Sequence, residues 1–146
     1  MDNWNKNCIF CRIIQKDIPN AIIYENEKFL AFMDKYPINL GHTLIVPKHH
    51  YSNLLEMPIA VVGEMYSLVP PLAKAITGVI KSDGFNINQN NGRSANQIVP
   101  HVHVHIVPRY SAEKIKGQWP TRKIAKMQDL QGLAKKITEN LSTRYE

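Results

Sequence analysis

The sequence predicts an α+β domain built around an antiparallel sheet of about five strands, with one long helix and a C-terminal helix. Short apolar runs between turn residues indicate strands, and two longer segments carry apolar residues at helical spacing. The chain has 146 residues, of which 44% are hydrophobic, so it is long enough for one domain with a core and too short for two. Because no repeat or linker-like stretch divides it, we expect a single domain over 1–146.

The expected elements follow one another in meander order. A short helix covers 9–15, and a hairpin-like turn at Asn26 and Glu27 joins the first two strands. Pro70 and Pro71 lie inside the longest helical pattern and must kink or split it, because proline lacks the N–H that a helix interior needs. The strands are predicted at 21–25, 28–34, 42–47, 85–90 and 101–107, and the two longer helices at 58–81 and 127–142.

The charge and hydropathy of the chain limit the classes of partner and the cellular locations that we expect for it. A net charge of +6 suits an anionic partner such as a nucleotide or nucleic acid. The basic excess over 114–136, however, is more typical of a solvated helix face than of nucleic-acid binding. Glu64, Lys74 and Lys81 interrupt the longest apolar run, and the N-terminal MDNWNKN lacks the pattern of a signal peptide. We therefore expect a cytoplasmic protein with no membrane partner.

The two cysteines, Cys8 and Cys11, form a CxxC motif near the N-terminus. In a cytosolic protein this spacing indicates a redox or metal site before a structural disulfide. A thioredoxin-like redox motif would follow a strand, whereas only seven polar-leaning residues precede this one. Zinc is the better interpretation, with two more ligands to come from elsewhere, and two buried thiols without metal are the alternative.

The stretch HVHVHIV at 101–107 places three of the six histidines on alternate positions. On a strand, His101, His103 and His105 share one face, while the residues between them face the core. The outer two are then roughly 13 Å apart, which excludes one metal bound by all three. An exposed strand that carries histidine on its outer face is the alternative. A row of neutral imidazoles suits chemistry on phosphate, because one ring can attack phosphorus while its neighbours donate hydrogen bonds or a proton.

This stretch resembles the His-x-His-x-His signature of the histidine triad (HIT) family of nucleotide hydrolases and transferases. The similarity extends over about 7–110 through CIFCRII, GHTLIVPK and NNG…NQ, leaves 111–146 as an extension, and is greatest to small bacterial and phosphoramidase-type members. The resemblance implies a homodimeric enzyme that acts at the α-phosphate of purine nucleotide derivatives through a covalent nucleotidyl-histidine. The implied substrates are an adenosine phosphoramidate, an adenylylated amine or a dinucleoside polyphosphate.

The resemblance assigns a separate role to each catalytic histidine. His103, the middle histidine of the triad, corresponds to the nucleophile. His105 corresponds to the histidine that binds a phosphate oxygen and assists the leaving group. His42, in GHTL, corresponds to a supporting histidine on the neighbouring strand, and a turn residue bonded to the backbone is the alternative for it.

The resemblance also supplies the two missing zinc ligands. In cysteine-bearing members one zinc is held by the CxxC motif, a histidine after the PK of the third strand, and the first triad histidine. Here these are Cys8, Cys11, His50 and His101, a closed set that would be structural. The adjacent His49 matches no ligand of the family and would face away from His50 on a strand.

The nucleotide contacts are likewise implied by the resemblance. Asp34 corresponds to the residue that binds the ribose hydroxyls, and Asn90 and Gln97 correspond to residues that hold phosphate. Gly92 allows a tight turn between those two. Four apolar residues match the walls of the base pocket, although a core would contain the same residue types: Ile9, Phe10, Ile13 and Phe32.

Three positions depart from the family pattern or match it loosely. Ile98 stands where many phosphoramidase-type members carry serine or threonine, and Lys35 replaces a commonly apolar residue. Trp119 loosely resembles a tryptophan that reaches the partner's active site in dimeric members, with packing on its own domain as the alternative. The missing hydroxyl at Ile98 leaves room for a regulatory nucleotide-binding module with weak catalysis. The basic C-terminal helix leaves room for a repair enzyme that removes 5′-adenylate from nucleic acid.

Overall fold

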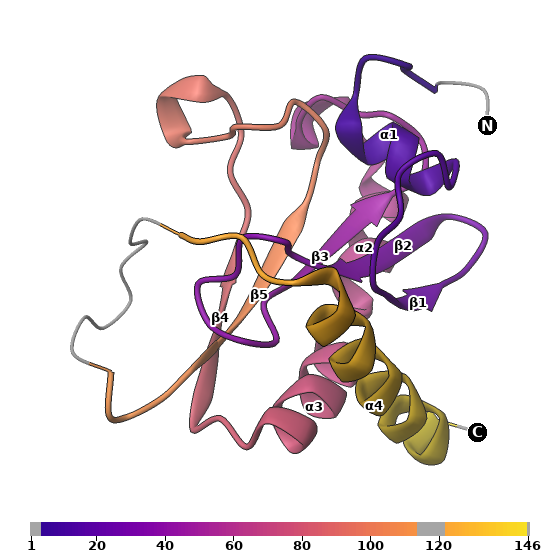
Figure 1. The fold of residues 1–146 in the computed structure, drawn as a ribbon. Coiled ribbons are helices and arrows are strands. Elements are labelled where there is room, and N and C mark those ends of the chain that lie inside the picture. Colours follow the sequence, from indigo (N-terminus) through magenta and orange to yellow (C-terminus); the bar gives the residue numbers. More distant parts are fainter. Residues whose placement is uncertain (1–3, 114–121, 146) are drawn as a thin grey trace.

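The computed structural model describes residues 4–113 and 122–145, and within them one five-stranded sheet forms the centre of the molecule (Figure 1). All neighbouring strands are antiparallel, in the order β1-β2-β3-β5-β4. The strands are β1 (Ile22–Glu25), β2 (Phe29–Met33), β3 (Thr43–Pro47), β4 (Gly84–Asn88) and β5 (Val104–Arg109). The predicted α+β class with about five antiparallel strands is therefore confirmed.

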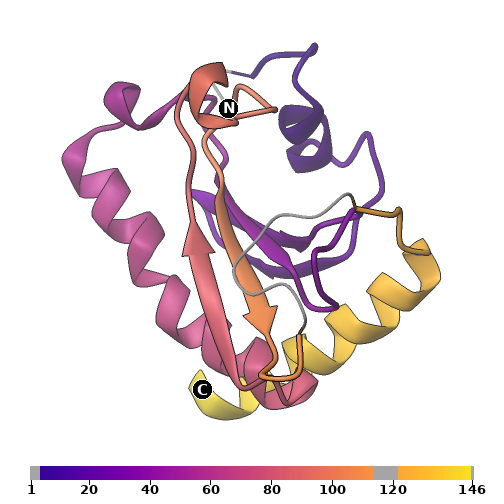
Figure 2. The ribbon, with the colours of Figure 1, turned by 90° about the vertical axis from the view of Figure 1, so that its left-hand side faces the viewer.

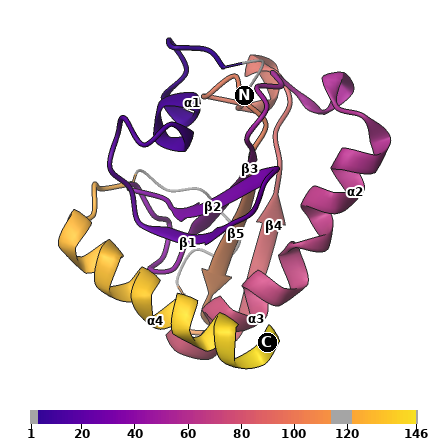
Figure 3. The same cartoon turned by 90° about the vertical axis from the view of Figure 1, so that its right-hand side faces the viewer.

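Helices cover both faces of this sheet, and they do so unequally (Figure 3). Three helices pack on one face, and the short α1 lies on the other. The helices are α1 (Ile9–Ile14), α2 (Ile59–Ser67), α3 (Val69–Ile80) and α4 (Met127–Tyr145), with short 3-10 turns at η1 (Leu54–Glu56) and η2 (Arg93–Ala95). The face that carries only α1 is left partly open, and the candidate site lies there.

The larger core fills the space between the sheet and α2, α3 and α4. Side chains alternate along a strand, so Phe29, Ala31 and Met33 of β2 all point into this layer. Val104 and Ile106 of β5 join them and are fully buried. The prediction that the aliphatic residues of the histidine stretch face the core is confirmed. The helices contribute Leu72, Ala73, Ile76, Leu130, Ala134 and Ile137.

A smaller core lies under α1 on the opposite face. Leu30 and Phe32 of β2 pack there with residues of α1, since they alternate with the residues that enter the larger core. The same alternation turns His103, just before β5, and His105, within it, toward this side, away from Val104. Helix α1 therefore helps to enclose the face on which these two histidines lie.

The long helix expected over 58–81 is divided into two helices. The break falls at Leu68, and Pro70 and Pro71 occupy the first turn of α3, where the backbone N–H groups have no partner inside the helix. By length and composition alone, Ile59–Ile80 is apolar enough to cross a membrane. The buried side chains of α3 instead pack on the sheet, as those of a core helix do.

The strand that contains part of the histidine stretch begins later in the sequence than predicted. The expected strand starts at residue 101, whereas β5 starts at Val104, so His101 and His103 lie in the segment before it. The reason is that the preceding N–H groups bond to loops. The N–H of His101 donates to Val99 O at 2.8 Å, and that of Val102 donates to Tyr51 O at 2.8 Å.

Strand β4 forms one edge of the sheet (Figure 2). It covers Gly84–Asn88 and so ends before the predicted residue 90. Phe85 and Ile87 are 44% and 38% exposed on this strand, which leaves apolar side chains at an open sheet edge.

Candidate active site

An open cavity of about 610 Å³ lies over the side of the sheet that carries α1. All four residues that the sequence predicts as walls of a base pocket line it, and three of them are also buried in the smaller core. The apolar lining comprises Ile9, Phe10, Ile13, Phe32, Leu44, Ile98 and Val99, and the polar lining includes Asp34, Asn88, Asn90, Asn96, His103, His105 and Arg122. The cavity thus has the size of a small-molecule site and combines an apolar wall with polar groups.

Hydrogen bonding fixes which nitrogen of His103 carries the proton. Nδ1 of His103 lies 2.7 Å from the backbone O of His101, and a carbonyl oxygen can only accept. Nδ1 is therefore the donor, and Nε2 keeps its lone pair. Burial lowers the pKa of His103, so the neutral form is favoured. The ring of Phe10 meets this imidazole edge-on at 5.0 Å between centroids and holds its orientation.

His42 and His105 form a hydrogen-bonded pair with an equally defined proton. The backbone N–H of Ile38 donates to Nδ1 of His42 at 3.0 Å, which leaves the proton of this ring on Nε2. That Nε2–H lies 2.9 Å from Nδ1 of His105 and donates to it. The remaining proton of the His105 ring is therefore on Nε2.

Both rings of this pair are neutral at physiological pH. Burial, followed by the charge of His105, lowers the pKa of His42 to about 2. Burial, followed by the charge of His103, lowers the pKa of His105 to about 3. The site therefore places His103, a neutral ring with a lone pair on Nε2, beside His105, a neutral hydrogen-bond donor.

A glycine turn places His42 at the start of β3. Gly41 has φ +97°, a left-handed conformation that side chains disfavour. A Cβ atom there would lie 2.9 Å from Cγ1 of Ile80 and 3.1 Å from Cγ of Pro108. Backbone conformation and packing therefore both require glycine next to this histidine.

Asp34 follows β2 and extends into the cavity from the side of β3. Its Oδ1 accepts the N–H of Tyr36 at 2.8 Å, and its Oδ2 accepts Nη1 of Arg122 at 3.1 Å. Oδ2 also lies 3.5 Å from Nε2 of His42. This contact is not an ion pair, because the His42 ring is neutral. Burial raises the pKa of Asp34, and the Tyr36 N–H and the Arg122 guanidinium oppose this rise.

The loop from Asn90 to Gln97 supplies polar groups to the cavity. Asn90 lines the cavity, and Gly92 adopts φ +87° in the expected tight turn. Gln97 lies outside the lining, and its side chain bonds to Gly92 N at 2.6 Å, Ser52 O at 2.6 Å and Val99 O at 3.1 Å. Its carboxamide therefore braces the loop in this structure, and the phosphate contact of Gln97 stays a prediction. Trp119 lies outside the described residues.

Several lining residues were not predicted from the sequence. Leu44 and Asn88 are the cross-strand partners of His105, so a predicted strand register would have identified them. Arg122 belongs to the extension after 110, where no motif marks it. Its place in the cavity follows from the packing of the C-terminal segment.

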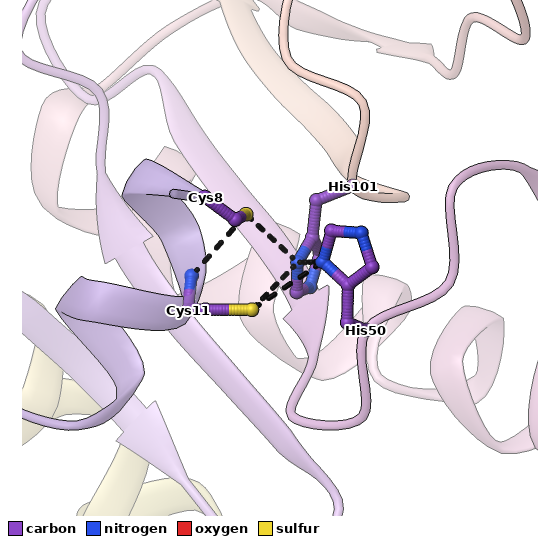
Figure 4. Close-up of side chains that lie close together, drawn as sticks. All are labelled: Cys8, Cys11, His50 and His101. Carbon is purple, nitrogen blue, oxygen red and sulfur yellow. Dashed lines mark hydrogen bonds between the residues drawn. The ribbon is translucent and has the colours of Figure 1, made fainter. Parts of the chain in front are cut away.

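Four side chains converge beside the cavity at the N-terminal end of α1 (Figure 4). Sγ of Cys8 lies 3.4 Å from Nδ1 of His101, and Sγ of Cys11 lies 3.3 Å from Nδ1 of His50. The two Nδ1 atoms are 3.1 Å apart. Tetrahedral zinc, with Zn–S and Zn–N bonds of about 2.3 and 2.0 Å, would space such ligand atoms at about 3.5 Å. The structure thus brings together all four predicted ligands at distances that fit zinc.

The orientation of His101 also fits a metal ligand. Its Nε2 donates to the O of Pro47 at 2.8 Å, which leaves the Nδ1 lone pair directed at the two sulfurs. Burial raises the pKa of the Cys11 thiol to about 11, and a metal would have to displace that proton. His49 instead packs its ring on Tyr51 at 4.5 Å.

The sheet topology and the row of histidines define a histidine triad protein. A family model described as the HIT domain matches residues 15–112 of the chain. The chain belongs to the HIT family.

Comparison with known proteins gives relatives over most of the chain. Protein hit of Bacillus subtilis is 39% identical over 140 residues, covering 94% of this chain and 97% of the relative. Adenosine 5′-monophosphoramidase hnt1 of Schizosaccharomyces pombe is 36% identical over 136 residues, covering 92% and 98%. A crystal structure of a zinc-bound histidine triad family protein from Mycobacterium smegmatis matches with TM-score 0.82 and 33% identity, covering 94% of each chain. Family membership and relatives named for a hydrolase activity indicate a nucleotide hydrolase.

Proposed function

We propose that the protein hydrolyses or transfers at the α-phosphate of a purine nucleotide derivative through a covalent nucleotidyl-His103. The observation that carries this proposal is the unprotonated Nε2 of His103 in a cavity that it shares with His105, whose Nε2 bears a proton. The relative from Schizosaccharomyces pombe, named an adenosine 5′-monophosphoramidase, supports an adenosine phosphoramidate as one substrate. An adenylylated amine and a dinucleoside polyphosphate are the other candidates.

The cavity accommodates the parts of such a nucleotide in sequence. The base would lie against the apolar wall that includes Phe10 and Phe32, and Asp34 would accept the ribose hydroxyls. The α-phosphate would then lie at His103 and His105, with Asn90 as an amide donor.

The chemical step would use the lone pair of His103. Its Nε2 attacks phosphorus, and the bond to the leaving group breaks with its electron pair on that group, whose departure the Nε2–H of His105 assists. The positive charge that develops on the His103 ring is stabilised by the Nδ1–H bond to the carbonyl of His101. Water, or another acceptor, then attacks phosphorus, and the P–N bond breaks with its electron pair returning to Nε2 of His103. The proton that the acceptor releases replaces the one that the leaving group took up.

The experiment that tests this proposal compares His103→Ala with the unchanged protein on one substrate panel. The panel contains adenosine and guanosine phosphoramidates and diadenosine polyphosphates. We expect turnover by the unchanged protein and its loss in His103→Ala, with His49→Ala as a matched control outside the cavity. Full activity in His103→Ala would exclude the covalent mechanism.

We infer that zinc is the structural metal of the four-ligand site. The support is the Cys2His2 donor set, its spacing and the zinc-bound histidine triad family protein from Mycobacterium smegmatis as a structural relative. Such an ion would be held by Cys8, Cys11, His50 and His101 and would fix α1 against the triad segment. About one metal per chain in elemental analysis, abolished in Cys8→Ser, is the expected result.

A nucleotide-binding module with weak catalysis is the alternative function. Ile98 favours it, because this residue lines the cavity, is 82% exposed and offers no hydroxyl to a phosphate. Calorimetry with AMP, set beside turnover of an adenosine phosphoramidate, separates the two functions. Tight AMP binding without turnover would favour the module.

We also propose that the chain forms a homodimer in the cytoplasm. The exposed apolar residues Phe85 and Ile87 on the edge strand β4 support an interface at this edge. Light scattering after size exclusion would show twice the mass of one chain. A charged substitution, Ile87→Lys, would then yield monomer.

A further inference from the structure

Arg122 reaches the active site from a part of the chain beyond the family match, which ends at residue 112. Its backbone is anchored nearby, because the N–H of Ala125 donates to the O of Lys35 at 2.7 Å. Helix α4 follows directly and buries Leu130 in the larger core. The guanidinium at Asp34 is therefore held by a packed helix, although its side chain is 28% exposed.

Two acceptors lie within reach of the single Nε2 proton of His42. Nδ1 of His105 is 2.9 Å from this nitrogen, and Oδ2 of Asp34 is 3.5 Å from it. A carboxylate is the stronger acceptor, since charge-assisted hydrogen bonds are shorter and stronger than neutral ones. A small movement of Asp34 would thus draw the proton away from His105.

Arg122 engages the same carboxylate oxygen. Its Nη1 donates to Oδ2 of Asp34 at 3.1 Å, while Oδ1 is held by the N–H of Tyr36 at 2.8 Å. Both oxygens of Asp34 are therefore fixed by donors other than His42. The orientation of the carboxylate depends on the ion pair, because the Tyr36 bond alone leaves rotation about the side chain possible.

We propose that Arg122 is a positioning residue, whose ion pair with Asp34 keeps that carboxylate charged and directed away from His42. The Nε2–H of His42 therefore continues to donate its hydrogen bond to Nδ1 of His105. The proton of the His105 ring in turn remains on its Nε2. The kinetic consequences rest on the proposed function, whereas the hydrogen-bond arrangement does not.

Two other groups act on these rings: His103, in the segment before β5, and Arg109, at the end of β5. Both remain in place when Arg122 is changed. In addition to burial and the neighbouring histidine, the charge of Arg122 also acts directly on His42 and His105 and lowers the pKa of both rings. The measurement therefore follows which nitrogen of neutral His105 carries the proton, because that choice depends on the Asp34 ion pair.

Nitrogen NMR of the histidine rings tests the arrangement without any turnover. The variants are Arg122→Gln and the conservative Arg122→Lys. Lys123→Gln is the matched control, because it removes one charge from an exposed neighbour in the same segment. We expect His105 protonated on Nε2 in the unchanged protein, in Lys123→Gln and in Arg122→Lys. In Arg122→Gln we expect a mixture of both neutral forms of His105.

The pH dependence of AMP affinity provides a second measurement. Loss of the guanidinium beside Asp34 raises the pKa of its carboxyl, because the positive charge that favours the ionised form is removed. A protonated Asp34 offers one acceptor fewer to the ribose, so affinity is lost as the pH falls through the pKa of Asp34. In Arg122→Gln this loss should begin at a higher pH than in the unchanged protein and in Lys123→Gln. We also expect a lower kcat in Arg122→Gln, because the Nε2–H of His42 is then shared between His105 and Asp34.

The outcomes separate this inference from the proposed function. An Arg122→Gln protein with the histidine forms and pH profile of the unchanged protein overturns the inference, as does an equal shift in Lys123→Gln. Thermal unfolding checks that each variant is folded. Absence of turnover in the unchanged protein would overturn the proposed function alone, since the NMR measurement still decides on Arg122.

Discussion

His101 contacts His103 through its backbone while its ring faces the two cysteines. The carbonyl of His101 accepts from Nδ1 of His103 at 2.7 Å, and Nδ1 of the His101 ring lies 3.4 Å from Sγ of Cys8. One residue thus contributes to both the candidate metal centre and the candidate nucleophile. The position of the His101 ring is linked to the position of the carbonyl oxygen that orients the His103 ring.

Removal of the metal should therefore lower catalysis as well as stability. Cys8→Ser leaves three ligands and removes one partner of His101 Nδ1, so we expect less than one metal per chain, a lower melting temperature and a lower kcat. Elemental analysis, thermal unfolding and turnover measure the three effects. A variant that lacks metal but keeps the kcat of the unchanged protein would show that the two sites are independent.

Loss of the His42 ring should lower the rate of the chemical step more than the affinity for nucleotide. In His42→Ala the Nδ1 of His105 loses its donor, and the proton of that ring is no longer restricted to Nε2. We expect kcat to fall on the order of 100-fold, as for loss of a positioned proton donor. AMP affinity from calorimetry should change little, and an equal loss in both quantities would contradict the role.

Asp34 should determine the preference for ribose over deoxyribose. Hydrogen bonds to a charged group contribute about 1.5–3 kcal/mol each, so Asp34→Asn should weaken AMP binding about 10- to 100-fold. Binding of 2′-deoxy-AMP should weaken less. Calorimetry with both nucleotides on both proteins measures the coupling, and identical losses would place Asp34 away from the sugar.

The free energy of unfolding should fall as the medium is acidified below about pH 6.5. In the unfolded chain histidine takes up a proton near pH 6.5, whereas burial holds the native pKa of His42 at about 2 and that of His105 at about 3. Between these limits the unfolded state binds more protons, so stability decreases by about 1.4 kcal/mol per pH unit for each ring. Urea unfolding from pH 7 to pH 4 should show a smaller slope in His105→Asn, with His49→Asn as the matched control.

Gly41→Ala should destabilise the protein and displace His42. The left-handed backbone and the 2.9 Å approach to Ile80 both oppose a Cβ atom at this position. We expect a loss of about 1–3 kcal/mol of stability from strain alone. The comparison is Gly63→Ala, in α2, where no atom lies within 4 Å of an added Cβ.

The sequence predicts most of the fold because hydrophobic periodicity reports directly on burial. Strand β2 and the alternating face of the histidine stretch are examples, since each buried position is visible as an apolar residue. The start of β5 is not visible in this way, because the N–H of Val102 bonds to a loop 51 residues earlier in the chain. Long-range backbone pairing of this kind leaves no local pattern.

The candidate site is predictable to the extent that its residues lie in motifs. Motifs contain His103 and Asp34, which line the cavity as expected. Motifs also contain the four predicted metal ligands, which lie together as expected. Gln97 lies in a motif as well, yet its role depends on which way its side chain turns. Arg122 lies in none, and its position depends on how α4 packs on the larger core.

Helix α1 has only six residues, too few for a stable helix in isolation. Cys8 caps its N-terminus and Cys11 lies in its first turn, both at the four-ligand site, and its side chains Ile9 and Phe10 line the cavity. An ion held by the cysteines and a base held by these side chains would each order the same six residues. Their binding free energies are therefore coupled, and linkage makes the coupling reciprocal. Nucleotide should tighten metal binding by the same free energy with which metal tightens nucleotide binding, so the two ligands would act as mutual effectors across a single helical turn.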